Sequence, residues 1–272
     1  MSRLLQRINT KGPRFGRCNI CGDERPLTED HTPPKSCGLV NQMELQSLHD
    51  KVVASGERWH QPRRFQAGVS FRSLCARCNN LLGAQYDPAL ADLCRQVRDL
   101  ANTTLYLGPA VSVKIRPQAV MRSVLGHLAA QGVDRYPKGP LTEPLRDYIL
   151  DGTASLPAQL RIYYWFYPYR AQVLVRDAAR MELGLDITLA FWLMKFFPLA
   201  FYVTHNEPQH RLYSLHNLDT FGNMPLAQEE VVPIQLRPLV HSEWPERPGS
   251  NDAIMYGQQA VSASPLSKVR RT

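Results

Sequence analysis

The sequence predicts an α+β protein in which a small zinc-stapled unit precedes a larger mixed α+β domain. Three observations lead to this prediction. Two Cys-x2-Cys pairs lie within the first eighty residues, apolar residues recur at helical spacing from residue 88, and strand-like runs follow. A chain of 272 residues is long enough for one large domain or two modest ones.

The first unit is expected over residues 1–87. Residues 1–16 are polar and basic, and their glycines and proline predict an arm or loop rather than a helix. A helix is predicted from Pro88, because a proline suits the first helical turn and the apolar residues that follow share one helix face. These residues are Leu90, Leu93, Cys94, Val97 and Leu100.

A mixed α+β domain is expected over residues 88–244. An amphipathic helix is predicted at residues 118–131 and a shorter helix after Pro144. Strands are predicted at residues 110–116, 161–170, 171–175, 187–194 and 200–204. The aromatic tract at 163–169 has two interpretations, a face that stacks on bases or part of the core, and strand spacing favours the core. Polar residues and a basic end predict a flexible tail over 245–272.

The charge of the chain suits a polyanionic partner. Lys and Arg number 32 against 24 Asp and Glu, which gives a net charge of +8 and a pI near 9.3. Residues 1–80 carry a net +6 and the remaining 192 residues a net +2, so the excess belongs to the N-terminal part. A solvated, solubilising surface is the alternative explanation. Nucleic acid is therefore an expected partner, and the charge places its binding in the first unit.

The sequence is not expected to contain a signal peptide or a membrane span. The first residues contain no apolar run long enough for a signal peptide, and the apolar stretch at 189–203 is interrupted by Lys195 and Pro198. We therefore expect a cytoplasmic protein without a membrane partner. In that compartment the six cysteines are expected to be metal ligands or buried thiols rather than disulfides.

The two Cys-x2-Cys pairs predict a structural zinc site. Two residues between cysteines form a tight knuckle that directs both thiolates at one ion, and two such knuckles complete a tetrahedral shell. The predicted ligands are Cys18, Cys21, Cys75 and Cys78. Chance pairing of unrelated buried cysteines is the alternative. Cys37 and Cys94 have no partner at metal spacing and are predicted to be buried thiols.

The segment between and after the knuckles adds a second pattern. An Asp-His pair followed by Pro33 and Pro34 lies after the first knuckle, and an asparagine directly follows the last cysteine. This order resembles the zinc-knuckle branch of the HNH endonucleases, which have the ββα-metal fold. The resemblance covers about residues 15–86. It implies a metal-dependent endonuclease that hydrolyses phosphodiester bonds, of DNA rather than RNA, and such nucleases also serve in defence against phage.

Carried over by position, the resemblance implies catalytic roles for three residues. Asp30 and Asn79 would hold a catalytic Mg²⁺ or Mn²⁺, and His31 would be the general base; Asn80 is a second candidate for the helix ligand. An imidazole is matched to removing a proton from water near neutral pH. The chain departs from the family at Ser70, where an asparagine usually fixes the loop that orients the histidine. Glu29 is either an outer-shell acceptor or an exposed carboxylate.

Arginines inside and after the insertion are candidate phosphate contacts, because guanidinium groups bind phosphates and neighbouring aromatic rings can stack on bases. They are Arg58, Arg63, Arg64, Arg72 and Arg77. A solvated loop would have the same composition. His49 and His60 are interpreted as surface histidines rather than ligands.

Three functions remain open at this point. The first is a metal-dependent endonuclease, which the joint presence of the Asp-His pair and the asparagine favours. The second is a zinc-knuckle module that binds nucleic acid through a decayed nuclease site, and Ser70 is its best support. The third is a structural zinc domain for protein assembly. The C-terminal domain is expected to supply target selection, regulation, or contacts with a second copy or a partner protein.

Overall fold

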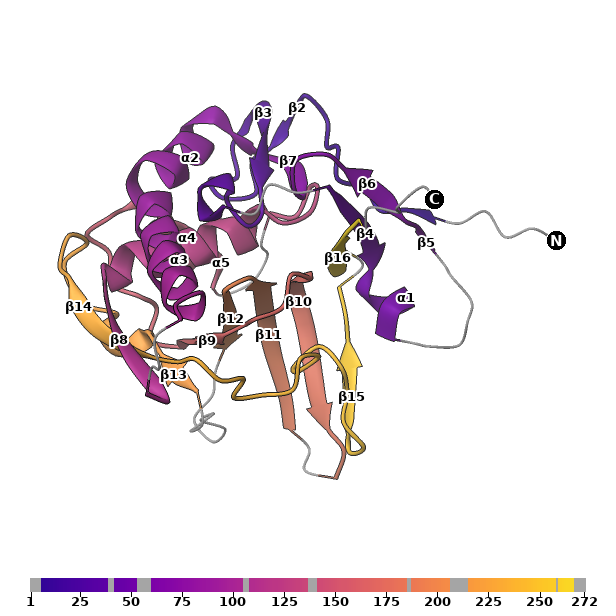
Figure 1. Cartoon of the computed structure of the whole chain (residues 1–272). Coiled ribbons are helices and arrows are strands. Elements are labelled where there is room, and N and C mark those ends of the chain that lie inside the picture. The colour runs from indigo at the N-terminus through magenta and orange to yellow at the C-terminus, as the bar shows by residue number, and fades with distance from the viewer. Residues whose placement is uncertain are drawn as a thin grey trace, which may run out of the picture.

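A computed structural model describes residues 6–38, 42–52, 60–104, 108–136, 141–184, 187–205, 215–257 and 259–266 (Figure 1). The described chain contains both helices and strands, largely in separate runs, and the predicted α+β class is confirmed. The α-helices are α1 (Leu48–Val52), α2 (Ala76–Leu81), α3 (Asp87–Ala101), α4 (Pro117–Ala130) and α5 (Thr142–Leu150). Among the described residues, no helix is long and apolar enough to cross a membrane.

A small antiparallel sheet carries the first Cys-x2-Cys pair and the Asp-His pair. Its strands are β2 (Phe15–Arg17), β3 (Glu24–His31) and β7 (Ser70–Cys75), in that spatial order. Helix α2 begins directly after β7, the last strand of this sheet in the chain. The N-terminal arm lies along β7, where the Arg72 N–H donates to the carbonyl of Thr10 at 3.0 Å. Burial of Ile8 and Thr10 fixes that part of the arm.

A nine-stranded sheet forms the larger layer, in the order β13-β9-β12-β11-β10-β16-β4-β6, with β15 paired to β10. Its strands are β4 (Met43–Ser47), β6 (Arg63–Phe65), β9 (Leu160–Phe166), β10 (Gln172–Glu182), β11 (Ile187–Phe196), β12 (Leu199–His205), β13 (His216–Asn217), β15 (Asp252–Met255) and β16 (Val261–Pro265). Two smaller pairs are β1 (Gln6–Arg7) with β5 (His60–Gln61) and β8 (Ala110–Ile115) with β14 (Glu230–Gln235).

This sheet revises the predicted domain boundaries. Strand β16 pairs with β10 on one side and with β4 on the other, so strands from the insertion between the knuckles extend a sheet built mainly from the C-terminal half. One continuous core contains residues from Ile8 to Ala263. Residue 87 is therefore not a break between separate cores. The predicted flexible tail contains two paired strands up to Pro265, while residues 267–272 lie outside the described residues.

The two faces of the large sheet are covered by different elements. Helix α4 lies on one face and is buried along its whole length, so it is not the amphipathic helix that the sequence predicts. The aromatic tract alternates between the faces: Tyr164 belongs to the core under α4, and Tyr163 and Trp165 to a second core on the opposite face. Burial of these rings confirms the core interpretation of the tract, and Tyr169 beyond the strand is exposed.

The remaining helices position the first unit on this sheet. A π-helical turn, Leu82–Tyr86, joins α2 directly to α3. A β-carbon on Gly126 of α4 would clash with the Leu82 side chain, so the glycine permits close packing of α4 on this turn. Helix α3 begins one residue before Pro88, as the sequence suggests. The zinc-knuckle unit is thus fixed to the core by α2, α3 and α4 together.

Candidate functional site

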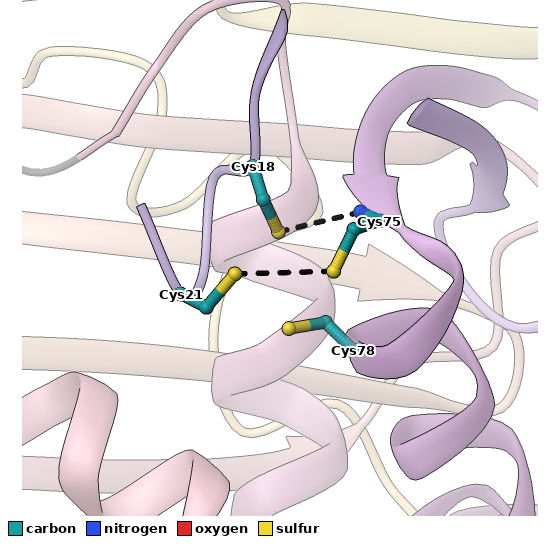
Figure 2. A group of neighbouring side chains, drawn as sticks. All are labelled: Cys18, Cys21, Cys75 and Cys78. Carbon is teal, nitrogen blue, oxygen red and sulfur yellow. Dashed lines mark hydrogen bonds between the residues drawn. The ribbon is translucent and has the colours of Figure 1, made fainter. Parts of the chain in front are cut away.

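The four cysteines of the two knuckles meet at one point (Figure 2). Their sulfur atoms lie within 4.8 Å of one another, and Cys21 Sγ is 3.8 Å from Cys75 Sγ. Zinc–sulfur bonds of about 2.3 Å in a tetrahedron place the sulfurs about 3.8 Å apart. The backbone N–H of Cys75 donates to Cys18 Sγ at 3.3 Å, a contact that orients a thiolate. The predicted cysteines therefore form a group that can hold a metal ion such as zinc.

The chemistry of the group also fits a cation. Hydrogen bonding from Cys78 lowers the pKa of Cys18 to about 5, so this sulfur is a thiolate near neutral pH. Burial raises the pKa of Cys21 to about 12, and the hydrogen bond with Cys18 raises the pKa of Cys78. Several thiolates at this distance repel one another unless a cation lies between them, and zinc binding releases their protons. The knuckle turns through Gly22, whose φ of +78° suits glycine.

Replacement of Cys75 by serine should remove the bound metal and much of the stability of the fold, because structural zinc binding is coupled to folding. Elemental analysis of protein purified without chelator should find one zinc per chain in the wild type and less than one in this variant. Cys37→Ser is the matched control, since Cys37 is equally buried but lies outside the group. Wild-type protein without zinc would contradict the assignment.

Asp30 and His31 are neighbours on β3, and Asp30 is turned into the core. Its carboxylate Oδ2 lies 2.9 Å from Nδ1 of His127 and accepts a hydrogen bond from the Thr32 hydroxyl at 3.3 Å. Only 3% of Asp30 is exposed. One carboxylate oxygen of Asp30 is thus already paired with an imidazole, and solvent hardly reaches the residue.

His127 on α4 is the residue that the sequence analysis missed. Its Nε2 lies 2.9 Å from Oδ1 of Asp87, which also accepts from the Ser123 hydroxyl at 2.8 Å. Although burial acts in the opposite direction, the two carboxylates raise the pKa of His127 well above its usual value. For Asp87 too, burial opposes the change, but His127 lowers the pKa. A buried imidazolium therefore links β3, the start of α3 and α4.

Asn79 on α2 reaches β3, as predicted, but its amide group bonds to Thr28 and Glu29 and not to Asp30. Its Nδ2 donates to the Thr28 hydroxyl at 2.9 Å and to the Glu29 carbonyl at 3.2 Å. No hydrogen bond joins Asn79 to Asp30 within the part of the chain that is described. Asn80, the second candidate, is exposed on α2. The observed contacts thus make Asn79 a clamp between the helix and the strand.

His31 ends β3 and is half-buried. Burial, followed by the nearby Lys35, lowers the pKa of His31, so the imidazole is neutral and able to accept a proton at pH 7. Ser70, which stands where the HNH family has asparagine, lies directly opposite His31 on β7. Glu29 forms an ion pair with Arg72 at 3.1 Å and is not a free outer-shell acceptor.

The candidate phosphate-binding arginines do not form one cluster. Arg63 and Arg64 lie on β6 and Arg77 on α2, and Figure 1 shows β6 and α2 on opposite sides of the small sheet. Arg64 and Arg77 are exposed, whereas Arg72 is engaged with Glu29. Arg58 lies outside the described residues. His49 is exposed at its side chain, in keeping with a surface histidine.

The residues present fit a structural metal ion better than a catalytic one. Four sulfurs converge on one point, whereas Oδ2 of Asp30 is paired with His127, and Asn79 donates its Nδ2 to β3 and keeps only its amide oxygen for an ion. Comparison with protein-family models, with curated proteins and with solved structures gives no match for this chain.

Proposed function

We propose that the zinc-knuckle unit hydrolyses phosphodiester bonds of nucleic acid, DNA rather than RNA, with zinc as the ion in the four-cysteine group. The observation that carries this proposal is the half-buried imidazole of His31 at the end of β3, a strand to which α2 is joined by the hydrogen bonds of Asn79 with Thr28 and Glu29. None of the six cysteines forms a disulfide, and four of them belong to the metal-binding group, which suits a reducing cytoplasm. A role in defence against phage is proposed from the resemblance alone.

His31 supplies the base in this proposal. Hydrolysis needs water to lose a proton as it attacks phosphorus, and an unprotonated imidazole accepts it. Asp30 acts through its neighbours: its pairing with His127 and Thr32 fixes the end of β3, and so the direction of the His31 side chain. Asp30 is thus a positioning residue. Mg²⁺ or Mn²⁺ remains the cofactor that the resemblance implies, with Asn79 and phosphate oxygens as its available ligands.

The test is incubation of the full-length protein with supercoiled plasmid, single-stranded DNA and RNA, each with Mg²⁺, with Mn²⁺ and with EDTA. Nicked or linear plasmid that appears with metal and disappears with EDTA supports a metal-dependent nuclease. Cleavage that persists in EDTA supports a histidine mechanism without the second ion. Absence of cleavage under all conditions contradicts the proposal.

A second function is favoured by one specific observation. The closure of Asp30 by His127 removes the open carboxylate that the HNH resemblance requires. A unit in this state could bind nucleic acid without cutting it. Tight binding to DNA in the absence of cleavage with any metal would establish this binding module in place of the nuclease.

Binding is expected to be mainly electrostatic, because the charge excess lies in the first eighty residues. Arg64→Glu and Arg77→Glu should each weaken DNA binding. Each should also make the plot of the logarithm of the binding constant against the logarithm of the salt concentration less steep, by about one for each phosphate that is no longer neutralised. Fluorescence anisotropy with a labelled duplex, between about 50 and 200 mM salt, gives that slope. Arg247→Glu, an exposed arginine near the C-terminus, is the control. Unchanged slopes in both variants would place binding elsewhere.

A further inference from the structure

A pocket of about 630 Å³ opens on the face of the large sheet that α4 covers only in part. Strands β10, β11 and β12 form its floor through Ala179, Trp192 and Val203, and α4, α5 and residues 134–136 form its walls. A volume in this range is that of small-molecule sites, which combine an apolar lining with a few polar groups. Nothing in the zinc-knuckle unit accounts for it.

The rim of the pocket is built from two aspartates in an unusual conformation. Asp134 and Asp177 have φ values of +53° and +58°, the only positive φ values of non-glycine residues in the described chain. Asp177 lies in a β-bulge of β10, where the register shifts between Val175 and Ala178. Such conformations and bulges concentrate at binding sites, where they direct side chains that a regular strand would not.

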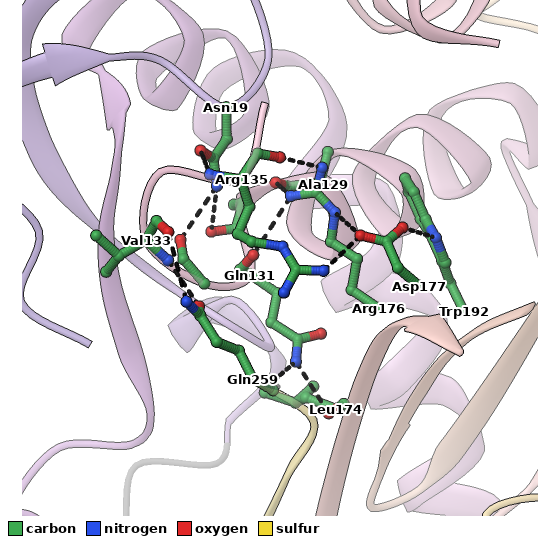
Figure 3. A network of polar contacts seen from close by, with 12 residues as sticks. Asn19, Ala129, Gln131, Val133, Arg135, Leu174, Arg176, Asp177, Trp192 and Gln259 are labelled. Atoms are coloured by element: carbon green, nitrogen blue, oxygen red, sulfur yellow. Dashed lines mark hydrogen bonds and ion pairs between the residues drawn. The ribbon is translucent and has the colours of Figure 1, made fainter. Parts of the chain in front are cut away.

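The contacts of Asp177 fix the aromatic floor. Its carboxylate accepts a hydrogen bond from Trp192 Nε1 at 2.8 Å and pairs with Arg135 at 2.6 Å. The buried guanidinium of Arg176 lies 5.2 Å from the centre of the Trp192 ring. It also donates to the carbonyls of Ala129, Gln131 and Arg135 (Figure 3). The indole is therefore held in one orientation before any ligand binds.

The lining of the pocket is mainly aromatic and apolar, with a few charged side chains. Trp192 and Tyr136 contribute aromatic surface, and the other lining residues are mostly leucine, alanine, valine and phenylalanine. Arg135 and Arg176 are engaged with Asp177 and with backbone carbonyls, so the pocket offers no unengaged arginine for phosphate. The carboxylate of Asp134 makes no hydrogen bond or ion pair with any described residue. The ligand that matches is flat and aromatic, and presents N–H donors to a carboxylate.

The geometry points to a binding site for a nucleobase, stacked on the indole of Trp192 and hydrogen-bonded to the carboxylate of Asp134. Nucleobases have a π-face that stacks on aromatic side chains, and their ring and exocyclic N–H groups donate to carboxylates. The base can belong to a free nucleoside or nucleotide, or to an unstacked residue of a single strand. This proposal does not depend on cleavage by the zinc-knuckle unit.

The pocket is joined to the first knuckle through residues 132–136 (Figure 3). Asn19, between Cys18 and Cys21, accepts from the Arg135 N–H at 2.9 Å and donates to the Gly132 carbonyl at 3.1 Å. The guanidinium of Arg17 lies 4.2 Å from the centre of the Tyr136 ring. The loop that would contact the base is thus held by the residues that surround the zinc ligands.

Isothermal titration of the full-length chain with adenosine, guanosine, cytidine and uridine tests the site. At least one nucleoside should bind saturably, and Asp134→Asn should weaken it at least tenfold. Asparagine tolerates positive φ, so this variant is expected to fold, which zinc content and the melting temperature check. Trp192→Phe should weaken binding less. Asp147→Asn, an exposed acid on α5, is the control and should bind like wild type.

Three further ligands complete the test. Xanthine keeps its N–H donors and caffeine has lost them to methylation, so caffeine should bind more weakly if Asp134 accepts hydrogen bonds. A short DNA single strand, added to the His31→Ala protein, should displace the nucleoside if the base comes from a polynucleotide, and should not if the ligand is free. Absence of saturable nucleoside binding, or binding unchanged in both pocket variants, overturns the proposal.

Discussion

Replacement of His31 by alanine is expected to abolish cleavage while zinc content and DNA affinity stay near wild type. The imidazole takes the proton from water in the proposed mechanism, and a positioned base contributes roughly 10²–10⁴-fold to the rate. It ligates no zinc, and a single neutral side chain adds little to an electrostatic affinity. Plasmid cleavage, elemental analysis and anisotropy on the same preparation separate the three effects.

The control for this experiment is His49→Ala, which removes a histidine on α1 whose side chain is partly exposed. Wild-type activity should also decline as the pH falls through the pKa of His31, which burial and Lys35 place below the usual 6.5. Cleavage by His31→Ala at the wild-type rate with every metal would show that the imidazole is not the base. The nuclease assignment would then be withdrawn in favour of the binding module.

Replacement of His127 by leucine is expected to cause a large loss of stability. The imidazolium compensates the buried carboxylates of Asp30 and Asp87, which the variant leaves without a cation. Breaking a buried ion pair in this way costs about 3–5 kcal/mol. Urea unfolding of both proteins, with zinc held constant, measures the difference.

The pH dependence of this effect has a definite sign. Because the folded pKa of His127 is raised, its contribution to stability is complete below the unfolded value of about 6.5 and is lost as the pH rises through the folded pKa. Because the pKa of Asp87 is lowered in the folded protein, its carboxylate also stabilises the fold, and this contribution is lost only when acid protonates it. When the pH is raised from about 6 to a value above the pKa of His127 in the folded protein, the free energy of unfolding should therefore fall more in the wild type than in His127→Leu. Equal losses would contradict a charged His127.

A double variant distinguishes the ion pair from simple packing. Asp30→Asn in the background of His127→Gln removes the charge of Asp30 while hydrogen-bonding groups remain on both sides. Its unfolding free energy should exceed the value expected from adding the two single effects, because the residues are in direct contact. Simple additivity would show that His127 contributes through its volume rather than its charge.

Local features of the sequence were predicted correctly where neighbouring residues decide the geometry. A Cys-x2-Cys spacing forms a knuckle whatever surrounds it, so the four cysteines could be assigned to one group from spacing alone. Asp30 and His31 lie on strand β3, and Cys78 of the second knuckle lies on helix α2, which begins at Ala76. Pro88 indicated the start of α3 because proline suits a first helical turn.

The partners of the candidate residues depend on contacts between distant parts of the chain. His127 lies 97 residues from Asp30 and 40 from Asp87, and a lone histidine in an apolar helix carries no signal that it will be charged. Strand β4 joins the large sheet through β16 at the other end of the chain, so no composition change at residue 87 could reveal the shared core.

By itself the sequence determined the class of the fold and the four cysteines that form a group able to hold a metal ion. Only the tertiary structure decided that Asp30 faces a buried imidazolium instead of solvent, and that an aromatic pocket lies beside residues 132–136. The physical reason is the range of the forces involved. Knuckles and strands are specified by residues a few positions apart, whereas burial and charge pairing depend on which surfaces the whole chain brings together.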